Sequence, residues 1–299
     1  MTSVTVIVPT VGRCESLRVT LIGLHWARAL VDMACELVIV SDAVQGNGGR
    51  DAVDVVVEQL SIPMTRVVTG PRAGRAAARN VGAAVGLGER LLFVDEDVVV
   101  GPDLLQACAT WDADHTFLHP AIFDFPRAQR WVEEVFSLAP ADVITRSRKL
   151  WEEERLVRGP LESAAEWLAD GRLPPRLGWL ASPAGALAIS RHVFDRLGGF
   201  NLAFGHDWGC EDLELGYRML QAGFSPRLGE CAVIHLTHPR RGRSDEHHRT
   251  LDLFRRLHPD QAIDALPALL GDGGNVAAFA RSVSLLATMS FDGDEMCEM

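Results

Sequence analysis

Apolar residues recur along the first hundred positions in two alternating patterns. Short continuous apolar runs of strand length are separated by longer stretches in which apolar residues lie three or four apart, as on one face of a helix. The strand-like runs cover residues 4–8, 37–40, 65–68 and 91–94, and the helix-like stretches cover residues 13–30, 51–60 and 73–87. This alternation predicts βαβ units, and therefore an α/β fold with a mostly parallel central sheet flanked by helices.

The fourth apolar run breaks into three consecutive carboxylates, Asp95, Glu96 and Asp97, before Val98–Val100 resumes it. An ionised carboxylate in an apolar segment is costly unless a cation or hydrogen-bond donors compensate it. On an extended backbone Asp95 and Asp97 project to the same side, where they can hold Mg²⁺ or Mn²⁺ together with substrate phosphates. The alternative is a solvated turn after a strand, which is the commoner origin of an isolated motif of this kind.

Polar residues also follow the first two predicted strands. Pro9 and Thr10 come after the first strand, and Ser41 and Asp42 come after the second. Ligands of open α/β sheets bind beyond the carboxyl ends of the strands, so we expect these residues to share one crevice with the acidic triplet.

Two arginines lie on the helix-like stretch that leads into the acidic strand. Arg75 and Arg79 are four residues apart, which places them on one helical face. Their guanidinium groups can steady a diphosphate or hold the carboxylates, and the alternative is a pair of solvated side chains.

Charge and motifs exclude several function classes. The formal net charge is −11 and the isoelectric point is about 5.4, which argues against nucleic acid as the main partner. No G-x-G-x-x-G follows the first strand and no G-x-x-x-x-G-K-[ST] occurs, so dinucleotide dehydrogenases and P-loop NTPases lack their phosphate-binding loop.

The composition fits a self-sufficient globular chain in a reducing compartment. The chain has 299 residues, 47% of them hydrophobic, and six cysteines without a C-x-x-C pair. No basic leader precedes the first strand, and no apolar run reaches the length that spans a bilayer. We therefore expect a cytoplasmic protein without a transmembrane segment, either free or resting peripherally on a membrane surface.

Four segments together resemble the family 2 glycosyltransferases, which have the A-type nucleotide-sugar fold. The segments are Val6–Thr10 with Arg13, Val38–Asp42, Ala78–Gly82 and Phe93–Asp97. The resemblance implies a nucleotide-diphospho-sugar donor, with Asp42 near the nucleoside, Asp97 on a divalent metal, and Asp95 toward the ribose or among the residues around the metal's direct ligands. It also implies donor-binding roles for Pro9, Thr10, Arg13, Arg75, Arg79, Asn80 and Glu96.

A later segment resembles the C-terminal part of galactosyltransferase-like enzymes. A Gly198-Gly199-Phe200 turn there precedes Trp208 and the pair Glu211-Asp212. Taken alone, acids at the start of a predicted helix are more simply explained by N-terminal capping. The resemblance implies instead that Asp212 is the general base that removes the acceptor's proton, and that Glu211 and Trp208 bind the acceptor.

Two histidines follow a strand-like run near the end of this segment. His235 and His238 can complete a divalent-metal shell with carboxylates, although a histidine beside a strand is more often structural. We expect Asp97, Asp95 and His235 to hold the metal, with His235 ahead of His238.

These observations predict a catalytic domain over residues 1–238, with a nucleotide-sugar half (1–119) and an acceptor half (120–238). Residues 239–299 are expected to form a helical extension with a disordered tail. The expected activity is Mn²⁺- or Mg²⁺-dependent transfer, with inversion, from a UDP-sugar to a glycan, a small molecule or a lipid-linked acceptor. A homo-oligomer is compatible with the sequence. The alternatives are a retaining N-acetylgalactosaminyl-type transferase and a catalytically silent module that binds sugar nucleotides or glycans.

Overall fold

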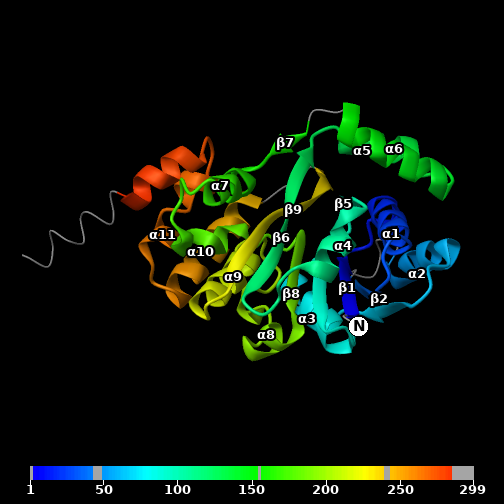
Figure 1. The fold of residues 1–299 in the computed structure, drawn as a ribbon, viewed down its shortest axis with the longest axis horizontal. Helices are drawn as coiled ribbons and strands as arrows, with labels where there is room; N and C mark the ends of the chain where they lie inside the picture. Colours follow the sequence, from blue (N-terminus) through cyan, green and yellow to red (C-terminus); the bar gives the residue numbers. More distant parts are fainter. Residues whose placement is uncertain (1–2, 43–48, 154–155, 239–242, 285–299) are drawn as a thin grey trace, which may run out of the picture.

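The computed structural model describes residues 3–42, 49–153, 156–238 and 243–284. Within these residues the strands form one sheet with the order β3-β2-β1-β4-β8-β6-β9-β5, and β7 pairs with β6 outside this path. Helices pack on both faces of the sheet (Figure 1). The predicted α/β architecture is therefore confirmed.

The first part of the chain follows the predicted alternation, with each expected element within three residues of its predicted bounds. The elements are β1 (Ser3–Thr10), α1 (Cys14–Arg28), β2 (Ala34–Ser41), α2 (Gly49–Leu60), β3 (Thr65–Thr69), α3 (Arg75–Val85), β4 (Arg90–Val94), β5 (Val98–Val100) and α4 (Asp103–Thr110).

The second part is richer in helices. Its elements are β6 (Thr116–Phe125), α5 (Ala128–Val135), α6 (Pro140–Glu153), β7 (Val157–Arg158), α7 (Pro160–Ala169), the 3₁₀ helix η1 (Pro175–Ala181), β8 (Ala186–Ser190), α8 (Arg191–Arg196), the 3₁₀ helix η2 (Leu202–Phe204), α9 (Glu211–Gln221), β9 (Ser225–Leu236), α10 (Arg243–Leu257), α11 (Gln261–Asp264) and α12 (Pro267–Leu270). Residues 276–284 are also helical.

Strand direction changes halfway across the sheet. Strands β3, β2, β1 and β4 are parallel, whereas β8 runs antiparallel to both β4 and β6. Strand β9 is parallel to β6 and antiparallel to β5. The sheet is thus parallel from β3 to β4 and mixed beyond β4, and the Leu236 N–H at the end of β9 reaches the Asp97 carbonyl in the turn after β4.

Side-chain alternation along the parallel strands explains why both faces are apolar. Alternate residues of one strand point to opposite faces, and a sheet covered on both sides needs apolar residues at every position. In β1, Val6 and Val8 pack into the core that α1 and α4 cover, whereas Ile7 packs into the core beneath α3 and α9. The strand β4 is divided in the same way, with Leu92 in the first core and Phe93 in the second.

The helices after β9 continue the core of the domain. The ring of Phe254 in α10 lies 5.7 Å from the ring of Trp179 and 6.0 Å from that of Tyr217, measured between ring centroids. Among the described residues no helix is both long and apolar enough to cross a membrane. The predicted disordered tail, residues 292–299, lies outside the described residues.

Candidate active site

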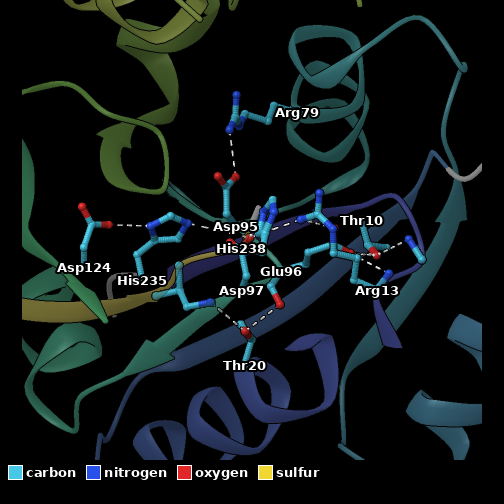
Figure 2. A network of polar contacts seen from close by, with 12 residues as sticks. Thr10, Arg13, Thr20, Arg79, Asp95, Glu96, Asp97, Asp124, His235 and His238 are labelled. Carbon is cyan, nitrogen blue, oxygen red and sulfur yellow. Dashed lines mark hydrogen bonds and ion pairs between the residues drawn. The ribbon is translucent and has the colours of Figure 1, made fainter. Parts of the chain in front are cut away.

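The acidic triplet forms a tight turn between β4 and β5. Hydrogen bonds fix the backbone of this turn: the Thr20 hydroxyl donates to the Glu96 carbonyl (3.0 Å) and accepts from the Val98 N–H (3.0 Å), and the Leu236 N–H donates to the Asp97 carbonyl (2.8 Å). Figure 2 shows the side chains of the triplet spreading from this turn toward different partners. The backbone of the turn is therefore held in place, and the three carboxylates point toward different partners.

Glu96 joins the turn to the loop that follows β1. Its side chain is 5% exposed and accepts hydrogen bonds from the Thr10 hydroxyl and from the Arg13 N–H, the latter at 3.2 Å. Burial raises the pKa of the Glu96 carboxyl, and the bond from Thr10 acts against that rise. Glu96 thus holds two loops of the site together.

Asp97, His235 and His238 form the group of the described residues that can hold a metal ion, with one ligand atom from each lying within 4.8 Å of the others. Asp97 Oδ2 lies 3.0 Å from His238 Nε2 and 3.8 Å from His235 Nε2. One carboxylate oxygen and two imidazole nitrogens form a donor set that suits a first-row divalent ion.

The orientation of His235 also fits a metal ligand. Its Nδ1 lies 2.7 Å from Asp124 Oδ1, so Nε2 faces Asp97 (Figure 2). Metal-binding histidines usually donate their other ring N–H to such a carboxylate, which fixes the ring and increases its basicity. Burial lowers the pKa of His235, but the bond with Asp124 and the charge of Asp97 outweigh burial and raise that pKa above its usual value.

Asp95 does not join the metal group, contrary to the prediction. The expectation assumed an extended backbone, in which residues two apart share a side; the turn at residues 95–97 separates them instead. Asp95 Oδ1 lies 2.8 Å from Arg79 Nη2 (Figure 2). His238, ranked below His235 from the sequence, is the nearer of the two histidines to Asp97.

Arg79 links the acidic turn to the start of α9. Its side chain is 2% exposed; Nη2 pairs with Asp95, and Nη1 lies 3.0 Å from Glu211 Oε1. Burial lowers the pKa of Arg79, but the negative charges of Asp95 and Glu211 have the larger effect, so the pKa of Arg79 is raised above its usual value. Arg75 Nε also lies 3.6 Å from Glu211 Oε1, so both predicted arginines face carboxylates.

Two adjoining cavities meet at this ion-pair network. Cavity A, about 240 Å³, is lined by the predicted donor-binding residues Pro9, Thr10, Arg13, Asp42, Glu96 and Asp97, among others. Cavity B, about 390 Å³, is lined by Trp208, Glu211, Asp212 and His235, among others. Arg75, Arg79 and Asp95 line both cavities. Residues from both halves of the predicted catalytic domain therefore line two cavities that share these three residues.

Asp212 lies in the first turn of α9, in the wall of cavity B. Its Oδ2 accepts the Ala184 N–H (3.1 Å) and its Oδ1 accepts the Leu213 N–H (2.8 Å). Burial and the negative charge of Glu211 raise the pKa of Asp212 to about 6, against the effect of Arg79. A carboxylate with a pKa near neutrality is suited to accept a proton.

Two other predicted donor-binding residues have defined local roles. Asp42 Oδ1 accepts the Arg72 N–H (2.6 Å), which orders the loop before α3, and Asp42 also lines cavity A. The side-chain amide of Asn80 exchanges two hydrogen bonds with the backbone of Phe200, at 2.8 and 2.9 Å. Asn80 therefore fastens the Gly-Gly-Phe turn to α3, which differs from the direct donor contact expected of it.

Sequence reasoning missed Asp124, the partner of His235. Asp124 lies in β6, within the apolar stretch Ala121–Phe125, and a lone carboxylate in such a strand is the signal that could have found it. It also missed Glu162 of α7, which lines cavity B and lies 2.9 Å from His119 Nε2.

Two family models match the chain. Residues 5–135 match the model described as glycosyl transferase family 2, and residues 175–241 match the model described as the N-terminal domain of galactosyltransferase. The resemblance to family 2 glycosyltransferases is confirmed. The first match covers the part that carries most of cavity A, and the second covers Trp208, Glu211 and Asp212.

Solved structures of sugar transferases share the fold. The mannosyltransferase PcManGT from Pyrobaculum calidifontis, in complex with GDP-Man and Mn²⁺, is 18% identical with a TM-score of 0.56, over 95% of this chain and 75% of that one. TarS 1–349 from S. aureus with UDP-GlcNAc is 15% identical with a TM-score of 0.55, over 89% and 67%. GalNAc-T7 with UDP, GalNAc and Mn²⁺ is 17% identical with a TM-score of 0.54, over 90% and 50%. The fold is that of the A-type glycosyltransferases.

Two curated relatives are validoxylamine A glucosyltransferases. The protein from Streptomyces hygroscopicus subsp. jinggangensis (strain 5008) is 27% identical over 288 residues, covering 85% of this chain and 60% of that protein. The protein from subsp. limoneus is 27% identical over 256 residues, covering 74% and 50%. The chain thus spans about half to three fifths of these relatives. Together with the family matches, they support a glycosyltransferase.

Proposed function

We propose that this protein transfers a sugar, with inversion, from a nucleotide-diphospho-sugar in cavity A to an acceptor hydroxyl in cavity B. The observation that carries the proposal is the arrangement of the two cavities. Cavity A reaches Asp97 of the metal-binding group, cavity B reaches Asp212, and the two meet at Arg75, Arg79 and Asp95. A donor in the first and an acceptor in the second would meet at the shared wall.

On the donor side, Asp97, His235 and His238 would hold a divalent ion. Two imidazole ligands favour Mn²⁺ over Mg²⁺, which prefers oxygen ligands. When bound, such an ion supplies Lewis-acid stabilisation of a diphosphate leaving group. Arg13 Nη1 lies 3.2 Å from Asp97 Oδ2, so its guanidinium is placed to bind phosphate oxygens at the same edge of cavity A.

On the acceptor side, Asp212 is the proposed general base. Its raised pKa of about 6 leaves it ionised at pH 7 while keeping it basic enough to take a proton from a hydroxyl. Glu211 Oε1 is committed to Arg79, so Glu211 sets the charge around Asp212 and offers its other oxygen to acceptor hydroxyls. Asp212 lines cavity B but not cavity A, whereas Asp97 lines cavity A; this placement supports attack from the face opposite the nucleotide and hence inversion.

The structural neighbours and the curated relatives indicate which donors and acceptors to test first. Structural neighbours were solved with GDP-Man, with UDP-GlcNAc, and with UDP, GalNAc and Mn²⁺. The curated relatives are named for the glucosylation of validoxylamine A. We propose a UDP-sugar as donor and a small polyhydroxylated ring as acceptor, so that an acceptor screen starts with validoxylamine A, methyl α-glucoside and methyl β-glucoside.

The test is the Asp212→Asn variant in that screen. We expect it to bind donor as the wild type does and to lose transfer by about 10²–10⁴-fold, the usual contribution of a general base. The matched control is Asp170→Asn, an exposed carboxylate whose loss leaves turnover unchanged. Normal turnover by Asp212→Asn would refute the assignment of the base.

NMR of the product separates the alternatives. An inverted anomer supports the proposal, and a retained anomer supports the N-acetylgalactosaminyl-type alternative. Donor binding without turnover in the wild type, across all donors and acceptors of the screen, would instead support a silent binding module.

A further inference from the structure

The helices after β9 supply part of the wall of cavity B. His247 of α10 and Leu270 of α12 line this cavity together with Trp208, Glu211 and Asp212. Both residues lie beyond residue 241, where the second family match ends. The acceptor side of the site is therefore completed by a part of the chain that neither family model describes.

The ring of His247 fits against the turn that leads into α9. Its centroid lies 5.7 Å from that of Trp208, with 50° between the ring planes. His247 Nδ1 lies 4.0 Å from Cys210 Sγ. A Cβ atom built on Gly209 would lie only 2.8 Å from the same His247 Nδ1. Gly209 and Cys210 have φ values of +106° and +63°, so the chain makes a strained turn here that leaves room for the ring.

The other nitrogen of His247, Nε2, has no hydrogen-bond partner among the described residues. Nε2 is buried, and none of the described residues bonds to it. Burial and the neighbouring His248 lower the pKa of His247, so the ring is neutral at pH 7 and can either donate or accept. A buried polar atom without a partner is costly, and its presence in the wall of a cavity indicates a ligand that satisfies it.

A second unpartnered atom lies in the same wall. Glu211 Oε2 is buried and has no hydrogen bond to the described residues, whereas Oε1 is paired with Arg79. A ligand that satisfies both atoms must donate a hydrogen bond to Glu211 Oε2 and must donate to or accept from His247 Nε2, which hydroxyl groups can do. Trp208 lines the same cavity, and its aromatic ring suits the apolar face of a sugar or cyclitol ring.

We propose that His247 is an acceptor-binding residue that presents Nε2 to a hydroxyl of a polyhydroxylated ring lying against Trp208. The inference rests on the proposed function and deepens it, because it assigns the helical extension a direct part in choosing the acceptor. The neutral imidazole can donate to or accept from a hydroxyl, and it brings no positive charge that would favour an anion.

Two variants with different expected effects on the acceptor KM test this role. Gln in place of His247 keeps a polar group near the position of Nε2, whereas Phe keeps a ring against Trp208 and removes the nitrogen. For His247→Phe we expect the acceptor KM to rise about tenfold, the effect of one lost hydrogen bond, with the donor KM unchanged. For His247→Gln we expect an acceptor KM within about threefold of the wild type. The control is His248→Ala, an exposed neighbour on the same helix, which should behave as the wild type.

The measurement uses the purified full chain, the acceptor of the screen that supports the fastest wild-type turnover, and thermal unfolding of each variant. If His247 only packs against Trp208, then Phe is tolerated and Gln is the impaired variant, which would overturn the inference. Equal increases in donor and acceptor KM, with a lowered melting temperature, would overturn it as well. Absence of wild-type turnover with every acceptor would refute the proposed function, and this inference with it, before any variant is compared.

Discussion

Replacing Arg79 with Leu should destabilise the fold, because Arg79 neutralises two carboxylates at the centre of the site. The substitution leaves Glu211, which is 2% exposed, without its closest cation, whereas the Asp95 side chain is 30% exposed and can regain water. Breaking a buried ion pair by removing one partner costs about 3–5 kcal/mol. Arg75 remains 3.6 Å from Glu211, so we expect the lower end of that range, about 3 kcal/mol.

Urea and thermal unfolding of the purified variant measure this loss. For a chain of this length, 3 kcal/mol corresponds to a melting temperature lower by about 6 °C. The double variant Arg79→Leu, Glu211→Gln should recover most of the loss, because it also removes the uncompensated charge. The control is Arg130→Ala, whose partner Glu134 lies 3.0 Å away in an exposed pair worth less than about 0.5 kcal/mol. A single variant within about 1 kcal/mol of the wild type, or a double variant no more stable than the single one, would refute the reasoning.

Two further predictions concern activity. Because Asp212 must be ionised to act as a base, kcat/KM should rise with pH through the pKa of Asp212, about 6, and then level off. A pH–rate profile that is flat from about pH 5 to pH 8 would contradict this prediction. Asp124→Ala removes the partner of His235 Nδ1 and should raise the half-saturating Mn²⁺ concentration by about 10–100-fold. The measurement is metal activation of turnover, and the control is Asp114→Ala, which replaces an exposed carboxylate. Unchanged activation would show that Asp124 does not support a metal ligand.

The parallel half of the fold and its convergent loops could be predicted because they depend on local patterns. The carboxyl ends of parallel strands share an edge, so Thr10 and Asp42 come together once β1 and β2 are paired, and the Asp42 N–H donates to the Thr10 carbonyl at 2.8 Å. The same reasoning brought Asp97 to that edge. Hydrophobic periodicity is enough for such a prediction, because the spacing of apolar residues within each segment indicates whether that segment is a helix or a strand.

The histidine side of the site depends on pairings that periodicity does not reveal. Asp124 meets His235 because β6 pairs with β9 in a register that aligns these two residues. Val98 pairs with His235 across β5 and β9, which brings the end of β9, and with it His238, toward Asp97. A single-residue shift in either register would turn these side chains to the other face.

Two features that the sequence did not reveal have equally specific causes. Asp95 was expected beside Asp97 on an extended backbone, and the turn between β4 and β5 separates them. The position of His247 in the wall of cavity B depends on how α10 packs beside this cavity, and the spacing of residues within α10 carries no information about that contact.

Isothermal titration with UDP-, GDP- and dTDP-sugars, with and without Mn²⁺, tests the central claim most directly, because the proposed donor site requires the group Asp97, His235 and His238. The account predicts that one nucleotide class binds to the wild type only when Mn²⁺ is present, and that Asp97→Asn loses this binding. Equally tight binding in the presence of a chelator, retained binding by Asp97→Asn, or no binding of any sugar nucleotide would contradict it.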